Sequence, residues 1–236
     1  MNLDKYKKEI ELMKKQNMTE YDMYSIIASI IREGNSVELL SIRDVNRRRK
    51  SEKGQVFYGL SGIPDFAILD FDFDNNDNKD MKVDNIDKVY GCIEIKEAGC
   101  TLLSVKDIIE KFKSKDGIKL GDEEGQILGE VLWYRKVIYT NGIRWMYYEW
   151  EEIDKEAWDC VKELVETRIN KEEEYRIKKN IDSRKSVTLP NFNWYNEIDF
   201  KNIKISEIEL INLSNEIKDD QWNEFINKLN HIKWNK

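Results

Sequence analysis

The chain has few of the residues on which several classes of protein depend. Its 236 residues include only three cysteines, Cys92, Cys100 and Cys160, and these form no Cys-x-x-Cys pair. An odd number without paired spacing argues against both a disulfide framework and a zinc site. A single histidine, His231, leaves little room for chemistry that needs a histidine dyad or several histidine ligands. Any bound metal is therefore expected to be a hard cation held by oxygen ligands.

Long apolar stretches are also missing. No run is long enough to span a bilayer, and the first eight residues lack the apolar segment of a signal peptide. We therefore expect a cytoplasmic protein with no membrane partner. Two prolines and 11 glycines give no obvious flexible linker.

Charge, in contrast, is abundant. Hydrophobic residues make up 40% of the chain and charged residues 36%, which suits a core inside a heavily charged shell. The net charge of −7 argues against a nucleic-acid partner, because phosphate contact favours basic surfaces. Salt screens distant charges, however, so a local basic run could still follow a phosphate backbone. The candidate run is Arg47, Arg48, Arg49, Lys50 and Lys53. A solvated loop is an equally good interpretation of it.

Hydrophobic periodicity predicts an α/β order of elements. Helices are expected at 4–16, 19–33, 104–114, 122–136, 154–179 and 219–230. Strands are expected at 55–60, 63–73, 88–96 and 203–212, with an extended segment at 37–45 and a hairpin at 137–150 around Asn141-Gly142. We predict one domain at 1–180, with its core at about 19–150, and a small C-terminal appendage at 181–236.

The strand at 88–96 carries an unusual pair of charges. Side chains alternate between the two faces of a strand, so Glu94 and Lys96 point the same way while Ile93 and Ile95 point to the other face. Burying either charge alone would be costly. An edge-strand ion pair between Lys96 and a neighbouring acid is the structural explanation, and a catalytic pair is the functional one.

A second acid belongs to the strand before it. Asp65 stands alone in an apolar run after Pro64, which marks a strand start or an edge because it cannot donate a ladder hydrogen bond. If the two strands pair antiparallel, Asp65 can approach Glu94. Two carboxylates repel unless a cation lies between them, and Mg²⁺ suits such a site. Lys96 could then orient or activate the attacking water and stabilise charge on a phosphate.

Pro64-Asp65, followed by Glu94-Ile95-Lys96 on the next strand, resembles the signature of the PD-(D/E)XK nuclease superfamily. The triplet of an acid, any residue and a lysine recurs at 77–79, 80–82, 199–201 and 216–218. Only Glu94–Lys96 lies on an apolar strand that follows a strand with Pro-Asp. The resemblance implies Asp65, Glu94 and the backbone carbonyl of Ile95 as metal ligands, with Lys96 assisting the water.

The resemblance extends over roughly residues 19–150. The predicted elements follow the αβββαβ order of the superfamily core, and the Thr140-Asn141-Gly142 turn before Trp145 resembles nuclease domains of restriction endonucleases, including the N-terminal domains of type I restriction subunits. This implies a restriction endonuclease-like α/β fold with a mixed central sheet flanked by helices. It also implies Mg²⁺-dependent cleavage of DNA, with Mn²⁺ able to substitute, in restriction or antiphage defence.

Supporting residues follow from the same resemblance. Many members carry an acid on the first core helix, for which we choose Glu20, with Glu33 and Glu38 as rivals. Glu20 is equally well explained as a first-turn partner of the helix dipole. Gln126 begins the second core helix, where some members have Gln-x-x-x-Tyr, and Glu130 stands at the tyrosine position. We interpret Glu130 as a solvated helix acid, with a further acid near the metal as the alternative.

Three functions are compatible with the sequence. The leading prediction is a Mg²⁺-dependent endodeoxyribonuclease. A catalytically silent nuclease-fold module that binds nucleic acid or protein is the alternative, and an ordinary α/β interaction protein is the third. The target sequence, the choice between DNA and RNA and the oligomeric state stay open, although homodimers are common in the superfamily.

Overall fold

The computed structural model describes residues 1–16, 19–33, 40–46, 57–73, 84–114, 117–182, 187, 189 and 192–234. Its helices are α1 (Leu3–Lys15), α2 (Glu20–Arg32), α3 (Val105–Ser114), α4 (Asp122–Tyr134), α5 (Lys155–Lys179) and α6 (Asp219–Asn230). Its strands are β1 (Leu40–Asp44), β2 (Phe66–Asp70), β3 (Val89–Ile95), β4 (Lys136–Thr140), β5 (Arg144–Glu151) and β6 (Lys204–Asn212). Short 3₁₀ turns are η4 (Asp84–Lys88), η5 (Trp194–Glu197) and η6 (Phe200–Asn202). Within these ranges, no helix has the length and apolar character needed to cross a bilayer.

The six strands form one mixed sheet in the order β1-β2-β3-β4-β5-β6. Every neighbouring pair is antiparallel except β3 and β4, which run parallel. Parallel neighbours need a long crossover, and here α3 and α4 supply it. The predicted α/β class with a mixed sheet flanked by helices is therefore confirmed.

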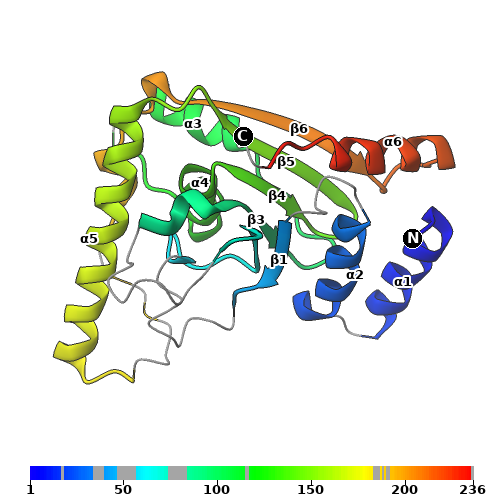
Figure 1. Cartoon of the computed structure of the whole chain (residues 1–236), viewed down its shortest axis with the longest axis horizontal. Helices are drawn as coiled ribbons and strands as arrows, with labels where there is room; N and C mark the ends of the chain where they lie inside the picture. Colours follow the sequence, from blue (N-terminus) through cyan, green and yellow to red (C-terminus); the bar gives the residue numbers. More distant parts are fainter. Residues whose placement is uncertain are drawn as a thin grey trace.

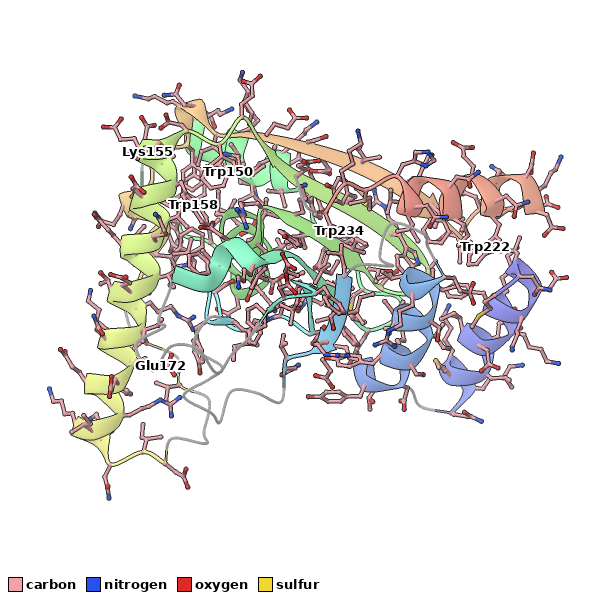
Figure 2. All side chains as sticks on the ribbon, in the orientation of Figure 1. Trp150, Lys155, Trp158, Glu172, Trp222 and Trp234 are labelled. Atoms are coloured by element: carbon pink, nitrogen blue, oxygen red, sulfur yellow. The ribbon has the colours of Figure 1, made fainter. Side chains whose placement is uncertain are left out.

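Helices cover both faces of the sheet, as Figure 1 shows. Strand side chains alternate between two buried clusters: Ile93 and Ile95 pack with α1, α2 and α6, whereas Cys92 and Val137 pack with α3, α4 and α5. Indole rings contribute to both clusters, with Trp158 on the α5 side (Figure 2). The fold is thus a three-layer sandwich in which a side chain on β3 faces either α2 or α4.

Local signals located most elements correctly. The predicted hairpin is present, with Asn141 Oδ1 accepting from the backbone N–H groups of Ile143 and Arg144 at 3.0 and 2.7 Å. Gly142 has a φ of +77°, which favours glycine. The expected start of α2 is also found, since the Thr19 N–H donates to the Asp22 carboxylate at 2.8 Å.

One predicted strand is wrong. Residues 57–60 form no strand, and 55–56 lie outside the described residues. Instead, Phe57 and Leu60 are buried in the cluster beneath α4 and α5 as part of an irregular segment. The strand that precedes β2 in the sheet is β1, which falls in the predicted extended segment at 37–45.

Strand β6 and helix α6, which fall within the predicted C-terminal appendage, pack against the rest of the described fold. Strand β6 pairs with β5 from Arg144 opposite Asn212 to Glu151 opposite Lys204. Helix α6 packs in the same cluster as α1, and Trp222 Nε1 donates to the Met1 carbonyl at 3.1 Å. Sequence periodicity located β6 and α6, but it could not reveal that they complete the sheet and one of its covering layers.

Candidate active site

Asp65 lies immediately before β2, where the chain passes beside the end of β3. Antiparallel pairing of β2 with β3 sets Phe66 opposite Ile93, as the sequence predicted. Asp65 Oδ2 consequently accepts the Ile95 backbone N–H at 2.8 Å. Its Oδ1 accepts from the Tyr24 hydroxyl and from Asn46 Nδ2, the latter at 2.9 Å. The carboxylate is thereby fixed by one donor from each of three segments.

Glu94 and Lys96 project from β3 and its end toward α4. Lys96 Nζ donates to Glu94 Oε1 and to Gln126 Oε1, each at 2.8 Å. Gln126 Nε2 donates to Glu94 Oε1 at 2.6 Å and to Glu130 Oε1 at 3.2 Å. The predicted shared face of Glu94 and Lys96 is confirmed, and Gln126 joins them from the first half of α4.

Glu130 is not the solvated helix acid that the sequence suggested. Only 2% of its surface is exposed, compared with 4% for both Asp65 and Glu94. Every residue from Ile127 to Tyr134 is buried, because α4 is packed between the sheet and neighbouring helices. A helix that is apolar all round is normally buried. The lone charge within Ile127–Tyr134 was thus a signal that could have identified Glu130.

The cluster holds three buried carboxylates and one ammonium. Burial, then the charge of Asp65, raises the pKa of Glu94 to about 7. Burial and the charge of Glu94 raise the pKa of Glu130 well above its ordinary value, and burial also raises the pKa of Asp65. Burial alone would lower the pKa of Lys96, but the charge and hydrogen bond of Glu94 outweigh it and raise that pKa. Lys96 is therefore a persistent cation, and burial holds the three acids around it toward their neutral forms.

Two carboxylate oxygens in the cluster are buried without a hydrogen-bond partner, Glu94 Oε2 and Glu130 Oε2. Such orphaned acceptors are rare in folded proteins and are costly to bury. A divalent cation would satisfy them and favour the ionised forms of these acids. No group of three or more histidine, cysteine, aspartate or glutamate side chains within the described ranges is arranged to hold a metal. Mg²⁺ needs only one or two carboxylates with water as the other ligands. Within the predicted pair of Asp65 and Glu94, the oxygen without a hydrogen-bond partner is Glu94 Oε2, since both Asp65 oxygens accept hydrogen bonds.

The three candidate acids for the first core helix, Glu20, Glu33 and Glu38, differ in their position relative to the cluster. Glu20, in the first turn of α2, is half-buried, and its pKa is raised by burial and then by the charge of Asp65. It therefore lies within electrostatic range of the cluster. Glu33 is at the other end of α2, exposed, and paired with the N-terminal amino group of Met1. Glu38 lies outside the described residues.

Two members of the cluster were not identified from the sequence. Tyr24 belongs to the apolar stripe of α2, yet its hydroxyl donates to Asp65. Asn46 follows β1 and donates to the same carboxylate. Both contacts depend on how α2 and β1 dock near the end of β2, which no local pattern encodes. The predicted basic run from Arg47 to Lys53 lies outside the described residues.

No family model matches this chain, and neither do curated proteins or solved structures.

Proposed function

We propose that the chain is a Mg²⁺-dependent endonuclease that hydrolyses phosphodiester bonds in DNA. The observation that carries the proposal is the convergence of Asp65, Glu94 and Lys96 at the end of β3, with two orphaned carboxylate oxygens beside them. An acid pair next to a persistent cation, in a largely buried place, suits the hydrolysis of a phosphate ester.

The order of elements supports the same proposal. Helix α2 is followed by the antiparallel strands β1, β2 and β3, then by α4 and the parallel strand β4. This is the order expected for a restriction endonuclease-like core, with α3 as an additional helix. The candidate site also lies at the carboxyl end of the parallel strand β3, where open α/β sheets commonly bind ligands.

Each residue has a role that its surroundings favour. Asp65 and Glu94 would hold Mg²⁺. The Ile95 carbonyl would be a third oxygen ligand, because the N–H and C=O of one strand residue point to the same side and the Ile95 N–H donates to Asp65. When bound, Mg²⁺ supplies positive charge to the reacting phosphate and makes water easier to deprotonate. The raised pKa of Lys96 keeps it protonated, so it donates hydrogen bonds to water or phosphate and does not act as a base. Gln126 orients Lys96 through the 2.8 Å bond.

Cleavage of supercoiled plasmid tests the proposal. We expect nicked and linear products with Mg²⁺ or Mn²⁺ and none with a chelator. Asp65→Asn and Lys96→Met should each reduce the cleavage rate by about 100-fold or more, as removal of a transition-state contact does in other enzymes. The matched control is Asp70→Asn, a partly buried acid at the far end of β2, which should cleave at the wild-type rate.

Two results would overturn the proposal. The first is cleavage that persists in both Asp65→Asn and Lys96→Met, which would indicate a contaminating nuclease. The second is folded wild-type protein that neither cleaves nor shows a calorimetric Mg²⁺ signal dependent on Asp65 and Glu94. That second result would favour the catalytically silent module, for which the net charge of −7 gives independent support.

A further inference from the structure

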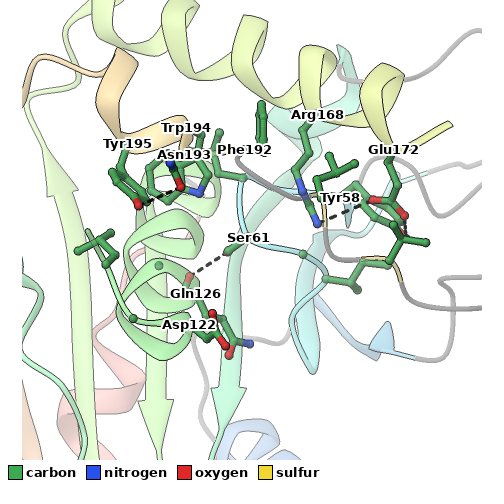
Figure 3. Close-up of a pocket in the computed structure, with 18 of the residues that line it drawn as sticks. Tyr58, Ser61, Asp122, Gln126, Arg168, Glu172, Phe192, Asn193, Trp194 and Tyr195 are labelled. Atoms are coloured by element: carbon green, nitrogen blue, oxygen red, sulfur yellow. Dashed lines mark hydrogen bonds and ion pairs between the residues drawn. The ribbon is translucent and has the colours of Figure 1, made fainter. Parts of the chain in front are cut away.

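A cavity of about 490 Å³ lies beside the candidate active site. Figure 3 shows its walls, which come from the irregular segment before β2, the start of α4, the second half of α5 and the residues around η5. Pockets of roughly 300–1,000 Å³ accommodate molecules of nucleotide size. Of the residues that line it, Gln126 alone has a role proposed above.

Two connections join the cavity to the catalytic cluster. Gln126 lines the cavity and also bonds to both Glu94 and Lys96. Ser61 donates to the Gln126 carbonyl at 2.9 Å, and the lining residues Ser61 to Ile63 lead through Pro64 to Asp65. A group bound in the cavity would therefore sit next to a phosphate at the cluster.

Four aromatic side chains line the cavity. Its rings belong to Tyr58, Phe192, Trp194 and Tyr195. Cations already lie over two of them, with Arg168 at 5.4 Å from the Tyr58 centroid and Lys171 at 5.2 Å from that of Phe192. Aromatic walls of this kind stack on the flat faces of bases, whatever the base.

The charged side chains of the cavity wall are balanced, two acids (Asp122 and Glu172) against two bases (Lys119 and Arg168), so the wall has no excess of positive charge that would select a phosphate. Glu172 Oε2 is buried with no hydrogen-bond partner, although Arg168 Nη2 lies 3.9 Å away. Glu172 Oε1 accepts from Arg176. A second carboxylate, Asp122, lines the start of α4, where Glu124 already accepts the Gly121 N–H at 3.0 Å. The edge of a nucleobase can donate an N–H to an accessible carboxylate of this wall, such as that of Asp122.

We propose that this cavity binds one unpaired nucleobase of the nucleic acid whose phosphodiester lies at Asp65, Glu94 and Lys96. This rests on the proposed nuclease function and names its substrate class. A base can enter only after leaving its stack, which is easiest where it is mismatched, bulged or single-stranded. The preferred substrate is therefore DNA with an unpaired base next to the scissile bond.

Binding measurements without cleavage test this directly. Fluorescence anisotropy with Ca²⁺ in place of Mg²⁺ compares a duplex carrying one bulged base with the same duplex fully paired. Stacking of one base strengthens binding roughly 5- to 150-fold, so we expect about tenfold or tighter binding to the bulged duplex. A 2-aminopurine at the bulge should lose fluorescence on binding because it stacks on the rings.

Two variants probe the cavity from different directions. Phe192→Ala removes a partly buried ring from the wall, and Gly125→Leu adds a side chain at a lining glycine whose Cβ would meet nothing within 4 Å. Both should abolish the preference for the bulge. The control for Phe192→Ala is Phe71→Ala, since Phe71 is 79% exposed just after β2, and it should retain the preference.

The outcomes separate the two proposals. Equal affinity for bulged and paired duplexes, or a preference unchanged in Phe192→Ala and Gly125→Leu, overturns the base-binding cavity. If cleavage depends on Asp65 but no bulge preference exists, the cavity proposal fails and the nuclease proposal stands. If the preference exists in a protein that never cleaves, the nuclease proposal fails and base binding stands. Asp65→Asn should lose cleavage and keep the preference.

Discussion

Glu94 occupies a place where its charge costs stability, so Glu94→Gln should stabilise the metal-free protein above neutral pH. Burial, followed by the charge of Asp65, raises the pKa of Glu94 from its ordinary 4.5 to about 7. One pKa unit corresponds to about 1.4 kcal/mol. Ionised Glu94 therefore destabilises the fold by about 3 kcal/mol relative to the unfolded chain. Glutamine keeps an oxygen that can accept from Lys96 and Gln126 but carries no charge.

The direction of the pH dependence follows from the raised pKa. Below about pH 4.5, Glu94 is protonated in both folded and unfolded chains, and no penalty exists. As pH rises, the unfolded chain loses this proton first, and the penalty grows until the folded group also ionises near pH 7. The wild type should thus lose up to about 3 kcal/mol between pH 4.5 and 8 through this group. Glu94→Gln should lack that loss.

Thermal unfolding with a chelator, from about pH 5 to 9, measures the effect. A chain of this size gains roughly 2–4 °C in Tm per kcal/mol, so Glu94→Gln should melt about 6–12 °C higher than wild type at pH 8. The gain should shrink toward pH 5. Glu97→Gln is the matched control, because Glu97 lies three residues after Glu94 but is exposed. This variant should change the free energy of unfolding by less than about 0.5 kcal/mol at any pH. A variant no more stable than wild type at pH 8, or a gain independent of pH, would refute the reasoning.

Two further predictions concern how α2 and α4 hold the cluster. A Cβ at Gly129 would lie 2.7 Å from Ser61 Oγ and 3.1 Å from the Ser61 backbone N, so Gly129→Ala should destabilise the protein by about 1–3 kcal/mol in chemical denaturation. Gly125→Ala, one turn earlier in the same helix and in open space, should instead stabilise it by up to about 1 kcal/mol; equal effects of the two would contradict the close approach of α4. Tyr24→Phe removes a hydrogen bond to the Asp65 carboxylate and should lower stability by about 1.5–3 kcal/mol and slow plasmid cleavage. Tyr21→Phe, on the same helix and 56% exposed, should change neither, and a matching loss there would count against the role of Tyr24.

Structural features that depend only on residues adjacent in the sequence could be predicted, because the geometry of strands and turns is local. The alternation of side chains along an extended segment predicts that Glu94 and Lys96 lie on one face of the sheet. The 2.8 Å hydrogen bond between them confirms this prediction. Asn141-Gly142 predicted the β4–β5 hairpin for the same reason. The approach of Asp65 to β3 needed only one further assumption, antiparallel pairing of neighbouring strands, which the register confirms.

Features that depend on docking could not be read in the same way. Tyr24 looks like any apolar position of α2, and only the packing of that helix near the end of β2 brings its hydroxyl to Asp65. The 55–60 segment has the composition of a strand, but Phe57 and Leu60 bury their side chains beneath α4 without pairing. A buried irregular segment and a buried strand share the same apolar residues, so composition alone cannot distinguish them.

The composition of the cluster favours the proposed cation site over a purely structural ion pair. An ion pair that served only the fold would need one acid for Lys96, and Glu94 already supplies it at 2.8 Å. The fold nevertheless buries Asp65 and Glu130 beside that pair, and it leaves one oxygen each of Glu94 and Glu130 without a hydrogen bond. Each such group weakens the metal-free protein, and apolar side chains of similar size would remove the penalty. Acids retained at such a cost are what the proposed cation site would require, because binding of the cation would offset the stability that the metal-free cluster loses. A larger Mg²⁺-dependent rise in Tm for wild type than for Glu94→Gln would show this link between binding and stability, and equal rises would exclude it.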